Sequence, residues 1–178
     1  FAPVYFPNAF DLSTAQVITL GADDDLVGYG FTALLGGVIE GRVEDEEGNP
    51  LEGIEVTPYP YVDTMGYGPD FDRDWRLVIT TASDGTFRMA GLLPVATRLE
   101  FVDNSGAYAT AAYSNAWDVY TDDSAVSVYP DLDTPPTITM VMTLGASVSG
   151  RLTESDGVTP IEGIWASIYT RTPGGWRI

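Results

Sequence analysis

Apolar and polar residues alternate along most of the chain with a period of two, which is typical of β-strands that bury one face. The clearest run covers residues 137–144, and its apolar members are predicted to point inward. These inward residues are Ile138, Met140, Met142 and Leu144. No stretch has the helical period, and Gly, Pro, Asn and Asp separate the runs, so the sequence predicts an all-β sandwich.

The same alternation gives the approximate strand positions. In the first strand, Ile39, Gly41 and Val43 share the predicted inner face, and Glu40 and Arg42 the outer one. The turn that follows contains Gly48 and Asn49, two residue types that accept positive φ. The predicted strands are residues 38–44, 54–59, 75–82, 86–89, 98–102, 107–113, 125–129 and 137–144.

Parts of the sequence recur at a spacing of about 110 residues. Residues 36–43 (GGVIEGRV) return as 145–152 (GASVSGRL), and residues 50–54 (PLEGI) return as 160–164 (PIEGI). Residues 75–77 (WRL) return as 176–178 (WRI) after a shorter interval, so one loop of the first copy, between Tyr59 and Trp75, is longer. Such a spacing indicates repeated structural units.

The N-terminal segment joins this pattern. Tyr5 and residues 8–11 (NAFD) resemble Tyr113 and residues 115–118 (NAWD), and the apolar positions of residues 29–35 match those of residues 138–144. The sequence therefore predicts the C-terminal part of a preceding repeat in residues 1–35, a complete repeat in 36–145 and the N-terminal part of a following repeat in 146–178. We expect the chain to be a piece of a longer array.

Two motifs of the complete copy resemble a known family. Residues 37–56 (GVIEGRVEDEEGNPLEGIEV) resemble the opening of carboxypeptidase regulatory-like domains, and residues 81–92 (TASDGTFRMAGL) resemble their middle. These domains belong to the transthyretin-like, or prealbumin-like, sandwiches, together with the CnaB-type repeats of surface adhesins. The resemblance implies tandem seven-stranded Greek-key β-sandwich repeats. It says little about function, because such modules serve as spacers and accessories in many unrelated proteins.

The chain departs from the family at several points. Members usually continue with a Leu-Pro-Pro-Gly-x-Tyr corner, where this chain has residues 92–97 (LLPVAT), so this corner must be built differently. The chain contains no Lys, and the isopeptide crosslink of CnaB-type domains therefore cannot form. It also contains no His, on which the transthyretin-like hydrolase and the metallocarboxypeptidase catalytic domain depend. Each departure favours a non-catalytic role.

Composition points in the same direction. The chain has no Cys, His or Lys, which removes thiol chemistry, the commonest general base and Schiff-base chemistry. We therefore predict that it is not an enzyme. The net charge of −18 repels nucleic acid and favours cations or basic surfaces as partners. No apolar run is long enough to insert into a membrane.

An acidic loop is the candidate metal site. Asp70, Asp72 and Asp74 are spaced two apart, and carboxylate oxygens at such a spacing can bind Ca²⁺, the one cofactor the sequence suggests. The loop lacks the EF-hand pattern, and Arg73 lies in its middle. The alternative is that these residues, like the other acidic runs, form solvated turns that keep the chain soluble and shield sheet edges.

The same long loop carries the candidate binding residues. Tyr61, Tyr67 and Phe71 lie among prolines and glycines, where aromatic rings can stack on a sugar or anchor a neighbouring protein. They can equally fold back as a lid over the open end of the sandwich. Trp75 is predicted to be structural, because its counterpart Trp176 recurs.

These features together predict a spacer or building block of an extracellular or cell-surface protein, such as a stalk, adhesin or filament. Its partners would be neighbouring repeats of the same chain, with copies of itself in a polymer as a further option. The alternative is a carbohydrate-binding accessory module of a secreted hydrolase, which would bind glycans through the aromatic loop.

Overall fold

The protein is all-β in the computed structural model. The structure describes residues 1–2, 4–9, 11–30, 32–33, 35–62, 70–71, 73–116, 119, 127–165, 167, 170–172 and 175–177. These residues contain ten strands and two 3-10 turns, η1 (Leu12–Thr14) and η2 (Trp75–Leu77), and no α-helix. The described residues fall into two units, Phe1–Gly145 and Ala146–Ile178. None of the described part of the chain forms a helix long and apolar enough to cross a bilayer.

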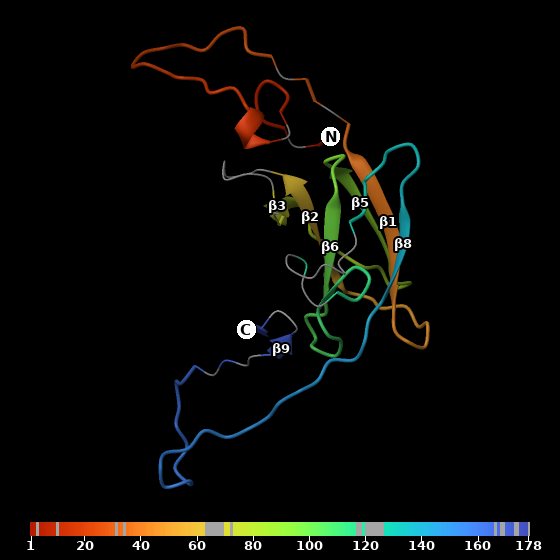
Figure 1. The fold of residues 1–178 in the computed structure, drawn as a ribbon, viewed down its shortest axis with the longest axis vertical. Helices are drawn as coiled ribbons and strands as arrows, with labels where there is room; N and C mark the ends of the chain where they lie inside the picture. The colour runs from red at the N-terminus through yellow and green to blue at the C-terminus, as the bar shows by residue number, and fades with distance from the viewer. Residues whose placement is uncertain are drawn as a thin grey trace. The chain divides into compact units, whose positions relative to one another are not determined.

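One sheet of the first unit has three strands, in the order β5–β1–β8 (Figure 1). Its middle strand β1 (Gly37–Glu44) pairs antiparallel with β5 (Thr86–Leu92). On its other side β1 pairs parallel with β8 (Thr137–Val141), with Glu40 opposite Thr137 and Glu44 opposite Val141. The unit's first strand and its last strand therefore run side by side in the same direction.

The second sheet is built on β2 (Glu55–Val62) and β6 (Thr97–Val102), which pair antiparallel from Glu55–Val102 to Pro60–Thr97. Two short strands extend it, β3 (Asp70–Phe71) beside β2 and β7 (Ala111–Ala112) beside β6. A further short strand, β4 (Ile79–Thr80), pairs with the start of β2. Figure 1 shows this sheet as a layer separate from β5, β1 and β8.

A single hydrophobic cluster joins the two sheets. Inward residues of β1, β5 and β8 meet inward residues of β2 and β6 and are almost fully buried. Each such side chain contributes about 1.5–3 kcal/mol when it leaves water. The two-layer, all-β arrangement around one core fits a β-sandwich. The strand members of the cluster are Ile39, Val43, Val56, Phe87, Met89, Leu92, Leu99, Phe101, Ile138 and Met140.

The alternation predicted the strand faces well near the centre of the unit. Ile39 and Val43 are fully buried, whereas Arg42 is exposed, as predicted. Ile138, Met140 and Met142 are buried as expected, but the prediction for Leu144 is wrong, because its side chain is 76% exposed. Strand β8 ends at Val141, and Leu144 instead forms an isolated bridge with Tyr108, outside the three-stranded sheet. Gly48 has the expected positive φ, while Asn49 does not.

Two predicted strands are much shorter than expected because side chains satisfy the backbone instead. In residues 75–82, the Asp74 carboxylate accepts a hydrogen bond from the Arg76 backbone N–H, which starts the 3-10 turn η2, and only Ile79–Thr80 is a strand. In residues 107–113, the Asp103 carboxylate binds the backbone of Ala107 and Tyr108, and the strand is confined to Ala111–Ala112. Carboxylates that accept from the local backbone compete with ladder pairing.

The other strands are close to prediction, with one exception. Strands β2, β5 and β6 run one to three residues beyond the predicted bounds. Residues 125–126 of the predicted strand 125–129 lie outside the described residues, and in the rest Val128 forms an isolated bridge with Thr97.

The second unit, Ala146–Ile178, contains two short paired strands, β9 (Thr170–Thr172) and β10 (Gly175–Arg177). Residues 146–165 include apolar residues at the positions that correspond to inward residues of β1. None of these residues is buried, and Val148, Leu152 and Trp165 are exposed. This unit therefore buries little of its apolar surface in the part that the structure describes.

Close packing around Gly41 gives a test of the sandwich. A Cβ atom on Gly41 would lie 2.6 Å from the Ile138 carbonyl oxygen and 2.7 Å from the Phe87 ring. Gly41→Ala should therefore lower the free energy of unfolding by about 1–3 kcal/mol, the usual cost of overpacking. Urea unfolding measures this loss.

The matched control is Gly150→Ala, at the corresponding position of the second unit. No atom lies within 4 Å of a Cβ placed there. This substitution makes the same change in the unfolded chain and should leave the unfolding midpoint of the first unit unchanged. Equal effects of the two substitutions would contradict the packing described for β1.

Candidate functional site

A cluster of polar and aromatic side chains covers the outer face of the β2–β6 sheet. Residues of β2 that alternate with the core residue Val56 point away from the core, and Tyr59 belongs to a separate small hydrophobic cluster with Ala112, Ala116 and Val119. The Tyr59 hydroxyl donates a hydrogen bond to a Glu100 carboxylate oxygen at 2.7 Å. This bond ties β2 to β6 across the outer face.

Arg73 lies over the first residues of β2 on this face. Its Nη2 donates to Glu55 Oε1 at 2.9 Å and to Thr57 Oγ1 at 3.3 Å. Both charged side chains are about a quarter exposed, so the ion pair is partly shielded from water. The pair fastens the segment that follows β3 onto β2.

Phe71 supplies the aromatic part of the outer-face cluster. Its ring centroid lies 5.0 Å from that of Tyr61, and Arg98 Cζ lies 4.3 Å from the Phe71 centroid. An arginine over an aromatic face is attracted by the ring quadrupole. Arg98 also donates to the Val119 carbonyl oxygen at 2.9 Å. Phe71 packs against the small cluster around Tyr59 and is half-buried.

The structure describes two of the three predicted binding residues. Tyr61 lies in β2 and is 44% exposed, and Phe71 in β3 is its direct neighbour. Tyr67 lies outside the described residues. The rings of Tyr61 and Phe71 pack against each other, and Phe71 also contacts Arg98 and the small cluster around Tyr59. Both rings therefore lie against the sheet, and Tyr61 remains partly exposed.

Of the three predicted calcium ligands, the structure describes the side chain of Asp74 alone. Asp70 lies in β3, where its backbone pairs with Val62, and Asp72 lies outside the described residues. Asp74 is buried, and its two carboxylate oxygens accept hydrogen bonds from Arg76 Nε at 2.9 Å and Nη2 at 3.0 Å. These bonds hold the pKa of Arg76 above its ordinary value. Calcium binding by the three residues stays a prediction.

Elsewhere, the described residues contain no group of three or more candidate metal ligands close enough to hold one ion.

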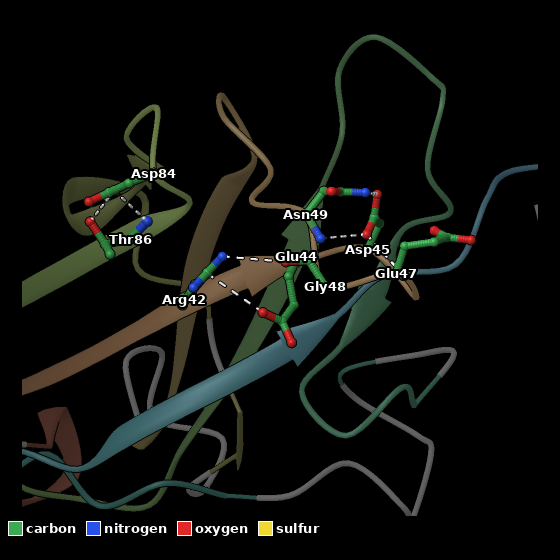
Figure 2. A network of polar contacts seen from close by, with 8 residues as sticks. All are labelled: Arg42, Glu44, Asp45, Glu47, Gly48, Asn49, Asp84 and Thr86. Atoms are coloured by element: carbon green, nitrogen blue, oxygen red, sulfur yellow. Dashed lines mark hydrogen bonds and ion pairs between the residues drawn. The ribbon is translucent and has the colours of Figure 1, made fainter.

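A network of polar contacts holds the turns at the end of the sandwich where β1 ends (Figure 2). Asp45 Oδ1 accepts from the backbone N–H groups of Glu47 at 3.0 Å and Asn49 at 2.8 Å, and Oδ2 accepts from the Asn49 side chain. The Asn49 amide is the main cause of a lowered Asp45 pKa. Asp84 accepts from the Thr86 hydroxyl at 2.6 Å and from its backbone N–H, and its pKa is also lowered.

The loop of residues 103–108 lies at the same end and is held by one carboxylate. Asp103 accepts from the backbone and hydroxyl of Ser105 and from the backbone of Ala107 and Tyr108, at 2.7–2.9 Å. The Ser105 hydroxyl is the main cause of its lowered pKa. Partial burial, together with the negative charge of Asp45, Glu47 and Asp103, raises the pKa of the Tyr108 phenol. This end of the sandwich is therefore acidic.

The turn after β1 has a counterpart in the second unit, with the same backbone hydrogen bonds. In each, the residue that opens the turn donates to the residue that closes it, and one glycine donates back to the opening residue. The corresponding donor and acceptor pairs are Asp45–Asn49 and Glu154–Thr159, Gly48–Asp45 and Gly157–Glu154, and Leu51–Val43 and Ile161–Leu152, all between 2.8 and 3.1 Å.

Side-chain and glycine positions agree with this correspondence. Arg42 Nη2 donates to the Gly48 carbonyl oxygen at 3.4 Å, and Arg151 Nη2 donates to the Val158 carbonyl oxygen at 2.8 Å. Gly48 and Gly157 both have positive φ, at 83° and 72°. The two turns are therefore alike in backbone bonding, in arginine position and in glycine conformation.

Sequence reasoning missed the charged members of the outer-face cluster. The sequence pattern shows Arg73 only as an interruption of the acidic loop and indicates no role for Glu55, Arg98 or Glu100. Their position on the outer face could have been found, because Glu55 on β2 and Arg98 and Glu100 on β6 alternate with core residues. Their partners could not, because the contacts join segments that are 18 to 41 residues apart.

The lowered pKa of Asp103 predicts a pH dependence of stability. A carboxyl whose pKa is lower in the folded than in the unfolded state stabilises the fold above its unfolded pKa, about 3.9, and this contribution is lost as the pH falls through the folded value. Asp103→Asn should therefore lower the urea midpoint at pH 6, and this difference from the unsubstituted protein should shrink as the pH falls below about 4.

Asp156→Asn is the control, because Asp156 has a similarly lowered pKa but lies in the second unit. It should leave the unfolding of the first unit unchanged over the whole pH range. A difference between Asp103→Asn and the unsubstituted protein that stays constant down to pH 2 would show that the charge of Asp103 has no part in holding the loop.

Comparisons with known proteins give no family assignment. No family model matches the chain, and no curated protein matches it. Among solved structures, the chain is similar to a crystal structure of a 9R-lipoxygenase from Cyanothece PCC8801, with a TM-score of 0.30 and 16% sequence identity. The match covers 66% of this chain and 18% of the lipoxygenase chain, so the chain spans less than a fifth of that protein.

Proposed function

We propose that this chain is part of a linear array of β-sandwich units that spans distance in a secreted or cell-surface protein. Its partners in this role are neighbouring units of the same chain, and it carries out no catalysis. The outer-face cluster then serves to hold the loop after β2 against the sheet.

The parallel pairing of β1 and β8 carries this proposal. β1 begins at Gly37, and β8 runs beside it in the same direction and ends at Val141. The chain therefore enters the unit at one end, here called the leading end, and leaves at the opposite, trailing end. A unit that carries the chain from one end to the other lengthens an array with each repetition, whereas a unit with both connections at one end does not.

The recurrence of the turn after β1 supports the idea of repetition. Arg42 and Arg151 lie 109 positions apart and make corresponding hydrogen bonds to turn carbonyls. The second unit also exposes apolar residues, such as Val148, at positions that correspond to buried residues of β1. This exposure is expected of a unit whose remaining strands are supplied by further chain.

The assignment to prealbumin-like, carboxypeptidase regulatory-like sandwiches with seven Greek-key strands is part of the same proposal. It rests on the glycine-rich motifs of residues 37–56 and 81–92. The chain has no Cys and no Lys, so no disulfide or isopeptide bond can brace a unit. Cohesion then comes from the buried core between the sheets, with contacts between neighbouring units adding to it.

The carbohydrate-binding alternative has one observation in its favour. Tyr61 is 44% exposed, and an exposed aromatic ring can stack on a sugar. The neighbouring Phe71 ring, however, contacts Arg98 and Tyr61 within the protein. The outer-face cluster is thus used largely for internal packing, which favours the spacer function.

The spacer function predicts a constant increase in length per unit. Strand β1 has eight residues and ends opposite Val141, and the four residues from Met142 to Gly145 follow, which at about 3.3 Å per residue gives a step of roughly 40 Å. Chains in which residues 146–178 are replaced by one or two further copies of residues 37–145 should lengthen by this step per copy in small-angle X-ray scattering. A maximum dimension that grows irregularly or hardly at all would contradict the proposal.

A glycan array distinguishes the two functions directly. We expect no binding by the 178-residue chain above background. Binding that is abolished by Tyr61→Ala, but kept by Tyr129→Ala, would instead establish the carbohydrate-binding function. Tyr129 is the control because its side chain is exposed and belongs to none of the aromatic contacts described above.

A further inference from the structure

The N-terminal segment packs on the leading end of the first unit. Ala2 is buried in a small hydrophobic cluster with Val62 at the end of β2 and Leu93 after β5, and Val95 packs against them. Figure 1 shows the N-terminus at this end of the sheets, where β1 begins. An apolar contact of this kind fixes where the segment lies.

Glycines bring the backbones together at the same place. A Cβ on Gly36 would lie 2.5 Å from the backbone carbon of Gly91, and a Cβ on Gly91 would lie 3.2 Å from the Phe1 carbonyl oxygen. Gly91 also has a positive φ of 83°. Gly36, Gly91 and Phe1 therefore meet where the chain enters β1, with no space for side chains between them.

The N-terminal segment corresponds to residues 108–112 of the first unit. Tyr5 forms a bridge with Ala9, and Ala112 forms a bridge with Ala116 across the same number of residues. Matched through these bridges, residues 5–11 (YFPNAFD) align with residues 112–118 (AYSNAWD) without a gap. This alignment places Phe6, rather than Tyr5, at the position of Tyr113. It also places Phe1 at the position of Tyr108 and Ala2 at that of Ala109.

The trailing end of the unit has a matching arrangement around Gly145. Gly145 donates a backbone hydrogen bond to Ala107 at 2.8 Å, and Ala109 donates to Thr143 at 2.9 Å. A Cβ on Gly145 would lie 3.3 Å from the Gly106 carbonyl oxygen. Gly145 lies 109 positions after Gly36, so the two glycines occupy the same position of the repeat. This position contacts the loop of residues 103–108 at the trailing end and Gly91 at the leading end.

We infer that successive units dock directly on one another. At every junction, the glycine at the repeat position of Gly36 and Gly145 belongs to both units. The docking surface is the corner formed by Gly91, Leu93 and Val95 with Val62, and its occupant is the part of the preceding unit that corresponds to Tyr108 and Ala109. Ala2 and the Phe1 carbonyl oxygen lie on this surface in the present chain. The inference rests on the proposed repetition of units, and it adds that no flexible linker separates them.

A cleft at the leading end agrees with this junction. Arg76 lies at the leading end, where it lines a cleft of about 250 Å³ with Phe1, Ala2 and Leu77. Its side chain is 69% exposed, and Tyr5 is close enough to affect its pKa.

Cysteine crosslinking in the full chain tests the docking, and the absence of natural cysteines makes the experiment clean. The test pair is Ala2→Cys with Val95→Cys, and the control pair is Val17→Cys with Val95→Cys. Val17 lies on the same N-terminal segment but is 86% exposed. Mild oxidation should crosslink the test pair at least about ten times faster, because its thiols are held in contact rather than brought together by a flexible chain. Equal rates would overturn the inference.

Gly36→Ala, added to the test pair, checks the role of the glycine. Its methyl group has no space beside Gly91, so the crosslinking rate should fall towards that of the control pair. The urea midpoint of the sandwich should remain close to that of the unsubstituted chain, which shows that the unit is still folded. An unchanged crosslinking rate would mean that the shared glycine does not set the junction.

The junction between two complete units is tested in the chain that carries an added copy of residues 37–145. Ala109→Cys in the first copy and Val95→Cys in the second should crosslink as fast as the test pair of the original chain. A slow rate, combined with a constant increase in length per copy, would leave the spacer function standing and reject direct docking. Fast crosslinking without that increase would reject the spacer function alone.

Discussion

The close, parallel approach of β8 to β1 is the constraint on which the rest of the first unit depends. β1 lies between β5 and β8, and at Gly41 the Ile138 carbonyl and the Phe87 ring together fill the space that a side chain would need. Because the pairing is parallel, the chain cannot return to its starting point and leaves at the far end of the sandwich. The second sheet, the core and the two ends are all arranged around this pair.

Much of the fold was predictable, because a strand that buries one face has a period-two pattern of apolar residues. This pattern can be recognised without knowing which strands pair. The inner faces of β1 and β8 follow it through Ile39, Val43 and Met140. The pattern failed where a strand ends, as at Leu144, and where a carboxylate takes up backbone N–H groups, as Asp74 and Asp103 do. Whether such a carboxylate binds the local backbone is decided by three-dimensional neighbours that a single sequence does not reveal.

The candidate site was less predictable than the core. The sequence places Tyr61 and Phe71 on one long loop as candidate binding residues, whereas in the structure they lie in β2 and β3 with their rings in contact. The ion pair of Arg73 with Glu55 and the contact of Arg98 with Phe71 depend on how the loop folds back. Every arginine of the first unit has an acidic or aromatic partner. The ion pairs and contacts involve Arg42, Arg73, Arg76, Arg88 and Arg98.

The parallel pair also determines how the unit responds to tension. A pull applied at Gly36 and Gly145 draws β1 and β8 along their own axes in opposite directions, since the chain enters at the start of one and leaves at the end of the other. The hydrogen bonds between them lie across this direction and are loaded in shear. They share the force and must break together instead of one after another, as they would if the strands were peeled apart from one end. A domain with this arrangement resists stretching through backbone geometry, without a covalent crosslink.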